Sequence, residues 1–144
     1  MLKTMFAASV ACLLATPYAS AETFEVLMLN RGEEGAMVFE PAFIAAAPGD
    51  TINFIATDPG HNVETIEGML PEGAEVMKSE MGEDFSVTLD VEGVYGVKCT
   101  PHYPMGMVAL IQVGAPVNLE DATAVTLRGK AKSRFEPLFA QIVP

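Results

Sequence analysis

Short stretches of strand length, rich in β-branched and aromatic residues, recur along the middle of the chain. Residues 85–91 (FSVTLDV) alternate apolar and polar positions, which is the period of a half-buried β-strand. Residues 23–30, 51–57, 94–98 and 107–113 have the length and composition of further strands. Turns containing glycine or proline separate them. The pattern predicts a β-sandwich or barrel, and the lack of intervening helices excludes a parallel α/β sheet.

Residues 115–144 change to a helical pattern. Asn118 fits an N-cap for a helix that ends at about Arg128. A second helix is predicted to start near Lys130, and Pro137 would break or kink it unless it lies in the first turn. So short a segment cannot bury a core alone, and we expect both helices to pack on the sandwich within one domain. The apolar face of the second helix would consist of Phe135, Leu138, Phe139 and Ile142.

The first 21 residues have the organisation of a secretory signal peptide. Lys3 gives a small positive region, residues 5–15 are apolar, and residues 19–21 (ASA) form a small-residue cleavage site. The apolar run is too short to cross a bilayer about 30 Å thick, and no other stretch of the sequence approaches a membrane span. We therefore expect cleavage of residues 1–21 and export of a soluble protein. Its sandwich would occupy residues 22–114 and its helical extension residues 115–144.

The chain is strongly acidic. It carries 8 Lys and Arg against 19 Asp and Glu, a net charge of −11, and loss of Lys3 with the leader would make the charge −12. Nucleic acids are bound by basic surfaces, so they are excluded as partners. Within residues 22–121 the only cations are Arg31, Lys78 and Lys98. The remaining cations lie near the C-terminus, where we expect a solvated helix face rather than a docking site: Arg128, Lys130, Lys132 and Arg134.

The residues with distinctive chemistry gather in one short segment. Residues 99–107 (CTPHYPMGM) contain Cys99, His102 and Met107, and His61, the only other histidine, lies upstream. Cys99 is the only cysteine outside the leader, and an odd cysteine in an exported protein indicates a reactive thiol, an intermolecular disulfide or a metal ligand. Two imidazoles, a thiolate and a weak axial thioether form the ligand set of a blue-copper electron-transfer site. The sequence therefore predicts one copper ion, cycling between Cu(I) and Cu(II), as the cofactor of these four residues.

The predicted strands explain how the four residues could meet. Cys99 ends one strand, Met107 begins the next, and His61 follows a turn at the end of another. Loops cluster at the ends of a sandwich, so these segments can lie together. The backbone N–H of Asn62 is a candidate donor to the thiolate, and such donors tune the reduction potential.

Other interpretations of the same residues remain open. Met105 rivals Met107 as the axial ligand, although the spacing from Cys99 favours Met107. A cysteine and a histidine can form a nucleophile and base, but no third orienting residue is evident. Structural zinc prefers four Cys or His ligands, and three remain once the leader is removed. Copper storage or delivery is the alternative function to electron transfer, whereas an oxidase or reductase with a second copper would need more histidines.

Two segments, GHNVET at residues 60–65 and KCTPHYPMGMV at residues 98–108, resemble the cupredoxins, and within them the pseudoazurins. The resemblance covers essentially the whole chain after the leader. It implies an all-β fold, an eight-stranded Greek-key cupredoxin β-sandwich with two C-terminal α-helices and one type 1 copper. It also implies that Met37 packs on a ligand imidazole and that His102 is the partly exposed electron port. The ligand atoms that it implies are His61 Nδ1, Cys99 Sγ, His102 Nδ1 and Met107 Sδ.

The resemblance implies a function as well. Such a protein is a periplasmic one-electron carrier, not an enzyme. Electron-transfer encounters have small interfaces, so we expect a monomer. Its partners would be redox proteins of denitrification, such as copper or cytochrome cd1 nitrite reductase, and c-type cytochromes. They would dock on an apolar patch near His102, with Arg31, Lys78 and Lys98 at its rim. Pseudoazurins usually surround this face with many lysines, so the few cations here predict weaker charge steering.

Overall fold

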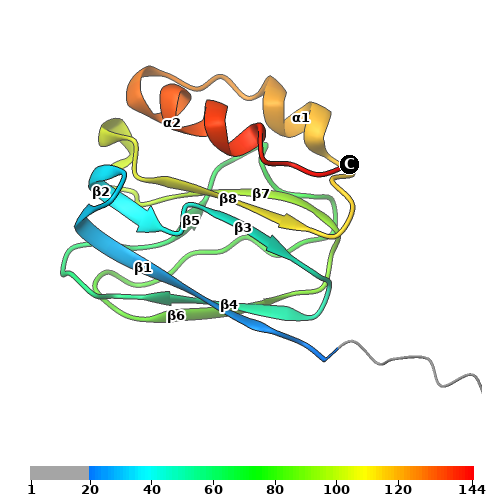
Figure 1. Cartoon of the computed structure of the whole chain (residues 1–144), viewed down its shortest axis with the longest axis horizontal. Coiled ribbons are helices and arrows are strands. Elements are labelled where there is room, and N and C mark those ends of the chain that lie inside the picture. Colours follow the sequence, from blue (N-terminus) through cyan, green and yellow to red (C-terminus); the bar gives the residue numbers. More distant parts are fainter. Residues whose placement is uncertain (1–19) are drawn as a thin grey trace, which may run out of the picture.

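The computed structural model describes residues 20–144, so the leader expected at residues 1–21 lies outside the described residues except for its last two. The described part forms two layers of strands and two C-terminal helices (Figure 1). None of its helices has the length and apolar character that crossing a bilayer demands. The strands are β1 (Thr23–Gly32), β2 (Gly35–Glu40), β3 (Phe43–Ala46), β4 (Asp50–Ile55), β5 (Glu64–Thr65), β6 (Phe85–Leu89), β7 (Gly93–Lys98) and β8 (Val108–Val113).

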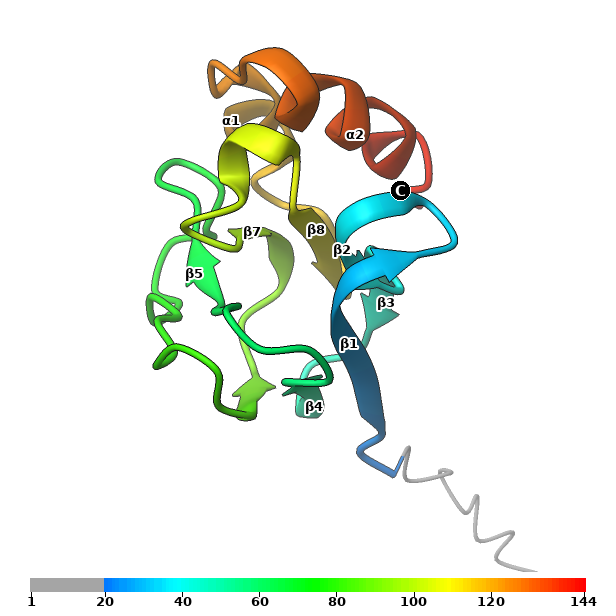
Figure 2. The same ribbon diagram turned by 90° about the vertical axis from the view of Figure 1, so that its left-hand side faces the viewer.

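The strands form two four-stranded sheets that face each other (Figure 2). One sheet has the order β2-β1-β4-β6 and the other the order β3-β8-β7-β5. Strand β1 pairs in parallel with β4, and β3 in parallel with β8, while the other pairs are antiparallel. This mixture arises because the chain crosses repeatedly between the sheets. The predicted eight-stranded, all-β sandwich is confirmed.

The core lies between the two sheets, where alternate positions of each strand point inward. In β6 the side chains of Ser86 and Thr88 are exposed and that of Leu89 is buried, which confirms the predicted alternation. Phe54 of β4 is fully buried, with its ring centroid 5.8 Å from that of Phe39 and 6.3 Å from that of Phe85. All residues of β8 are buried, because that strand is covered by the facing sheet on one side and by a helix on the other.

The helices α1 (Leu119–Ala124) and α2 (Gly129–Phe139) lie on the outer face of the sheet that contains β7 and β8 (Figure 1). Helix α1 packs on β7 and α2 packs on β8. Phe135 and Leu138 of α2 share a hydrophobic cluster with Val108 and Leu110 of β8. Both helices therefore contact the sheet that contains β7 and β8.

Asn118 is the N-cap residue as predicted, but the predicted end of the first helix and the predicted break at Pro137 are wrong. Helix α1 ends before Val125, which is extended, and Gly129, expected to follow a longer helix, begins α2 with a φ of 56°. Asn118 is the N-cap residue but makes no side-chain cap, because its amide bonds the N–H and the carbonyl of Val94 at 2.7 and 2.9 Å. These bonds fasten α1 to β7. Pro137 lies within the last turn of α2, where the helix forgoes only one hydrogen bond.

Candidate metal centre

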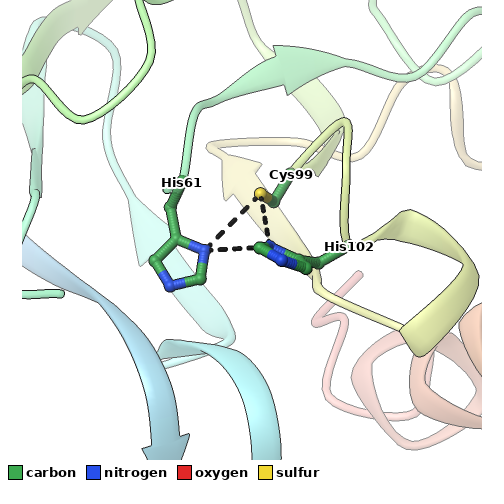
Figure 3. A group of neighbouring side chains, drawn as sticks. All are labelled: His61, Cys99 and His102. Carbon is green, nitrogen blue, oxygen red and sulfur yellow. Dashed lines mark hydrogen bonds between the residues drawn. The ribbon is translucent and has the colours of Figure 1, made fainter. Parts of the chain in front are cut away.

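Three side chains converge at one end of the sandwich, as Figure 3 shows. His61 lies in the connection between β4 and β5, Cys99 directly follows β7, and His102 precedes the short 3-10 helix η1 (Tyr103–Met105). Cys99 Sγ lies 3.7 Å from His61 Nδ1 and 3.4 Å from His102 Nδ1, and the two Nδ1 atoms are 3.1 Å apart. One donor atom from each residue lies within 4.8 Å of the others. The structure thus brings together three of the four residues singled out in the sequence.

The three residues differ in their access to solvent. His61 and Cys99 are both 0% exposed, whereas His102 is half-buried. Of the three donors, only His102 therefore connects the cluster with the surface of the protein.

Met107, the fourth residue, is buried beside the cluster through its backbone. Its carbonyl accepts the N–H of Cys99 at 3.0 Å, and its N–H donates to the carbonyl of His102 at 3.1 Å. Its side chain is 0% exposed, whereas that of Met105 is 43% exposed. Of the two methionines in the segment, Met107 is thus the one that points into the protein.

Asn30 of β1 determines which nitrogen of His61 carries the proton. Asn30 Oδ1 lies 3.0 Å from His61 Nε2, and an amide oxygen can only accept, so Nε2 donates. A neutral imidazole has one N–H, so its lone pair is on Nδ1, which points at Cys99 and His102. A histidine that binds a metal almost always donates its other N–H to a partner of this kind.

The surroundings shift the pKa of two of the donors. Burial raises the pKa of the Cys99 thiol, while the backbone N–H groups of Asn62 and His102 bond the sulfur and act in the opposite direction. The Asn62 donor expected from the sequence is therefore confirmed. Burial lowers the pKa of His61, the neighbouring His102 lowers it further, and Asp58 opposes them. Both shifts favour uncharged groups in the absence of a cation.

This donor set fits a copper ion. The lone pair of His61 Nδ1 faces His102 Nδ1 at 3.1 Å and the sulfur of Cys99 at 3.7 Å, an arrangement that a cation bound between them would stabilise. Imidazole together with thiolate suits copper in both oxidation states. A structural zinc site closes with four Cys or His ligands, and residues 20–144 contain three such residues.

Residues 99–107, the ligand loop, are held in shape by their own backbone. Besides the two bonds of Met107, the N–H of His102 donates to the carbonyl of Cys99 at 3.2 Å. Gly106 has a φ of 82° and ends η1 by donating its N–H to the carbonyl of Tyr103. Glycine is favoured there because it adopts this conformation without steric cost.

A side-chain network joins the ligand loop to the segment that carries His61. Asn62 Oδ1 accepts the N–H of Thr100 at 2.8 Å, and Asn62 Nδ2 donates to Thr100 Oγ1 at 3.1 Å. The Thr100 hydroxyl in turn donates to Glu64 Oε2 at 2.7 Å. Asn62 therefore interacts with the sulfur through its backbone N–H and with the ligand loop through its side chain.

Two residues with a role at this site were not recognised in the sequence. Asn30 had no signal beyond being a polar residue near the end of a predicted strand. Arg134 was expected on a solvated helix face, and this is wrong: it is half-buried and its guanidinium bonds three backbone carbonyls. Met37 is partly buried against the core, and its expected contact with an imidazole stays a prediction.

Replacing Asn30 with leucine should weaken copper binding by about 10- to 100-fold, the usual cost of losing a partner of a metal-bound histidine. The reason is that His61 would lose the acceptor that keeps its proton on Nε2. A competition titration with a Cu(I) chelator measures the change. Asn53→Leu is the matched control, since Asn53 Oδ1 accepts from Ser86 on the neighbouring strand. Equal affinities of the two variants would refute this role of Asn30.

The metal-free protein should lose stability on both sides of neutral pH. The pKa of His61 is lowered in the folded state from 6.5, so its contribution is present above pH 6.5 and is lost as the pH falls through the folded-state pKa. The pKa of Cys99 is raised from 9.0, so stability also falls as the pH rises above 9.0. Urea unfolding across this range measures both limbs. His61→Gln should flatten the acid limb, and an unchanged slope would contradict the assignment.

Comparison with known proteins places the chain among copper proteins. Residues 26–114 match the family of copper binding proteins described as the plastocyanin/azurin family. The chain is 52% identical over 140 residues to a pseudoazurin of Paracoccus pantotrophus, covering 96% of this chain and 97% of that protein. The crystal structure of pseudoazurin from Methylobacterium extorquens AM1 superposes with a TM-score of 0.81 at 52% identity, covering 83% of this chain and 98% of the other. For the pseudoazurin of Hyphomicrobium denitrificans the TM-score is 0.81 at 39% identity, covering 85% and 99%.

Proposed function

Since the chain belongs to the plastocyanin/azurin family of copper-binding proteins, and within it to the pseudoazurins, we propose that it carries single electrons to a periplasmic reductase such as nitrite reductase. Pseudoazurins are copper-dependent electron carriers rather than enzymes, so copper is the cofactor. The observation that supports the proposal best is the convergence of two imidazole nitrogens and one sulfur within 4.8 Å at the end of the sandwich.

In this proposal His61 Nδ1, Cys99 Sγ and His102 Nδ1 are the strong ligands and Met107 Sδ is the weak axial one. The burial of Met107 and its backbone bonds to Cys99 and His102 support its choice, and the exposure of Met105 argues against the rival. When bound, copper supplies a one-electron exchange between Cu(I) and Cu(II). The protein supplies ligands that are already fixed, which limits the rearrangement that accompanies each transfer.

His102 is the proposed port for the electron. It is the half-buried member of the cluster, and the exposed apolar residues Pro101, Pro104 and Met105 are its neighbours in the ligand loop. An apolar patch of this kind suits partner contact, and electron-transfer complexes are small and short-lived. Pro59, which follows β4 and is exposed, is proposed as a further member of the patch.

The proposed basic rim consists of Arg31, Lys78 and Lys98. Arg31 and Lys78 are exposed. The ammonium of Lys98 instead lies 3.9 Å from Glu64 and 5.4 Å from the centre of the Tyr103 ring. The charge of Lys98 is therefore partly compensated within the protein, which leaves Arg31 and Lys78 as the main attraction for an acidic partner.

Replacing both Arg31 and Lys78 with glutamate should slow electron transfer to copper nitrite reductase at low ionic strength. The difference in rate from the unaltered protein should shrink as salt is added. At physiological ionic strength, exposed charges more than about 8 Å apart are largely screened from each other. Stopped-flow kinetics over a salt series measures both effects. Arg128→Glu combined with Lys132→Glu, which changes two exposed charges near the C-terminus by the same total, is the control for net charge. Equal slowing by the control would refute a specific rim.

Repeated redox cycling tests the function itself. The copper-loaded protein would be reduced and reoxidised many times in the presence of a copper chelator, with copper content and visible absorption measured after each cycle. A carrier should retain its metal and its colour. Loss of copper to the chelator on reduction would instead favour storage or delivery, the alternative function.

We also propose that the chain acts as a monomer in the periplasm after removal of residues 1–21. A sandwich at residues 22–114 and the helical extension at residues 115–144 then form one domain, which the shared cluster of Phe135 and Leu110 supports. Mass spectrometry of the periplasmic protein should give an N-terminus at Glu22. A protein that keeps its leader in the cytoplasm would overturn this part of the proposal.

A further inference from the structure

Arg134 of α2 connects two segments that are far apart in the sequence. Its Nη1 donates to the carbonyls of Met37 at 2.6 Å and Gly106 at 2.8 Å, and its Nη2 donates to the carbonyl of Ala36 at 2.7 Å. Met37 and Ala36 belong to β2, and Gly106 belongs to the ligand loop. A planar guanidinium presents several N–H donors in a fixed geometry, so one arginine side chain can bond three backbone carbonyls.

On the loop side, Arg134 acts next to the proposed axial ligand. The carbonyl of Gly106 and the N–H of Met107 belong to the same planar peptide unit. Arg134 holds the carbonyl, and the carbonyl of His102 holds the N–H at 3.1 Å. Because both ends of this peptide unit are bonded, its rotation is restricted. The direction in which the Met107 side chain extends from the backbone is therefore restricted as well.

The atoms around Gly106 are tightly packed. A Cβ at this position would lie 3.0 Å from Cδ of Arg134 and 3.0 Å from the carbonyl oxygen of Lys130. The ligand loop therefore lies directly against α2, and the aliphatic part of Arg134 contributes to that contact.

On the other side, Arg134 bonds β2, which pairs with β1, the strand that carries Asn30. The pairing of β1 with β2 sets Leu29 against Val38 and Arg31 against Ala36, which places Asn30 opposite Met37. Met37 has a φ of 53°, so its carbonyl departs from the regular ladder and is available to Arg134. Asn30 is the residue that bonds His61 Nε2.

We propose that Arg134 is a positioning residue of the copper site. It sets the approach of the Met107 thioether through the Gly106–Met107 peptide, and it keeps the ligand loop at a fixed separation from the strands that hold Asn30. This inference rests on the proposed function, because it takes Met107 as the axial ligand. The axial ligand tunes the reduction potential of such sites, so a change in its position is measurable without any partner.

The test compares Arg134→Gln with Lys132→Gln, which removes the same charge from an exposed position of the same helix. In Arg134→Gln the thioether should withdraw, so the weaker of the two thiolate-to-copper bands should lose intensity relative to the stronger. The reduction potential should rise, because a weaker donor stabilises Cu(II) less. In the metal-free protein, amide exchange at Met107 should speed up by roughly tenfold, since a charge-assisted anchor is lost. Lys132→Gln should leave all three quantities unchanged.

Arg134→Lys separates positioning from charge. An ammonium keeps the charge but lacks the planar fork, so its band ratio and exchange rate should lie between those of Arg134→Gln and the unaltered protein. If Arg134→Gln fails to fold, the same measurements on Arg134→Lys test the inference. A variant that is only less stable, with the band ratio and potential of the control, would overturn the inference and leave the carrier function standing. A colourless copper-loaded wild type would instead overturn the proposed function.

Discussion

Replacing Cys99 with alanine should abolish the intense visible absorption of the oxidised, copper-loaded protein. That absorption requires a thiolate bound to Cu(II), and Cys99 Sγ is the sulfur that lies 3.7 and 3.4 Å from the two imidazole nitrogens. The two histidines alone would hold the metal in a different geometry, so reversible electron exchange should be lost as well. Absorption spectroscopy and voltammetry of the copper-loaded variant measure the two losses.

Met105→Leu is the matched control for this variant. Met105 lies in the same ligand loop but is 43% exposed, so its replacement should preserve both the absorption and the potential. A Cys99→Ala protein that kept its colour would show that the thiolate is not a ligand. A Met105→Leu protein with a raised reduction potential would instead show that Met105, not Met107, is the axial ligand.

Replacing Phe54 with alanine should lower the free energy of unfolding by about 3–5 kcal/mol. Phe54 is 0% exposed, and its ring meets those of Phe39 and Phe85 in the centre of the sandwich. The loss is a large share of the roughly 5–15 kcal/mol that stabilises a typical domain. Urea denaturation of the metal-free protein measures it without a contribution from bound copper.

Val76→Ala is the control for the core variant. Val76 is 70% exposed, and substitutions at such positions change stability by no more than about 0.5 kcal/mol. A Phe54→Ala protein as stable as this control would show that the layer between the sheets is not the main source of stability.

The candidate site could be predicted from the sequence because its residues are rare and chemically distinctive. Cys99, His102 and Met107 lie within one loop, and the only other histidine is His61. Their burial and convergence depend on the fold, but they can be recognised as candidate metal ligands without knowledge of the fold. The position of the Met107 thioether relative to the cluster, in contrast, depends on side-chain geometry and stays a prediction.

Three strands could not be predicted, each for a different physical reason. In β2, Met37 has a positive φ and interrupts the regular pattern. Strand β3 is short and pairs in parallel with β8, a partner more than sixty residues away, so nothing local indicates it. Strand β5 consists of Glu64 and Thr65 alone and exists only because it pairs with β7. Pairing across the sheet decides these elements, whereas local composition decided the five predicted strands.

The supporting residues were missed for a related reason. Asn30 and Arg134 are ordinary polar residues whose roles depend on which segments the fold places beside them. Arg134 lies in a cluster of cations near the C-terminus, and such clusters usually face solvent. Only the approach of α2 to the ligand loop turns its guanidinium inward.

The hydrogen bonds that shape the ligand loop come from the polypeptide alone, and this bears on how the protein matures in the cell. Because Cys99, His102 and Met107 are tied to one another through their backbones, the chain can fold before it meets any copper. The metal would then enter last, past the half-buried ring of His102, since His61 and Cys99 are closed off from solvent. Folding of the chain and acquisition of copper are thereby separate events.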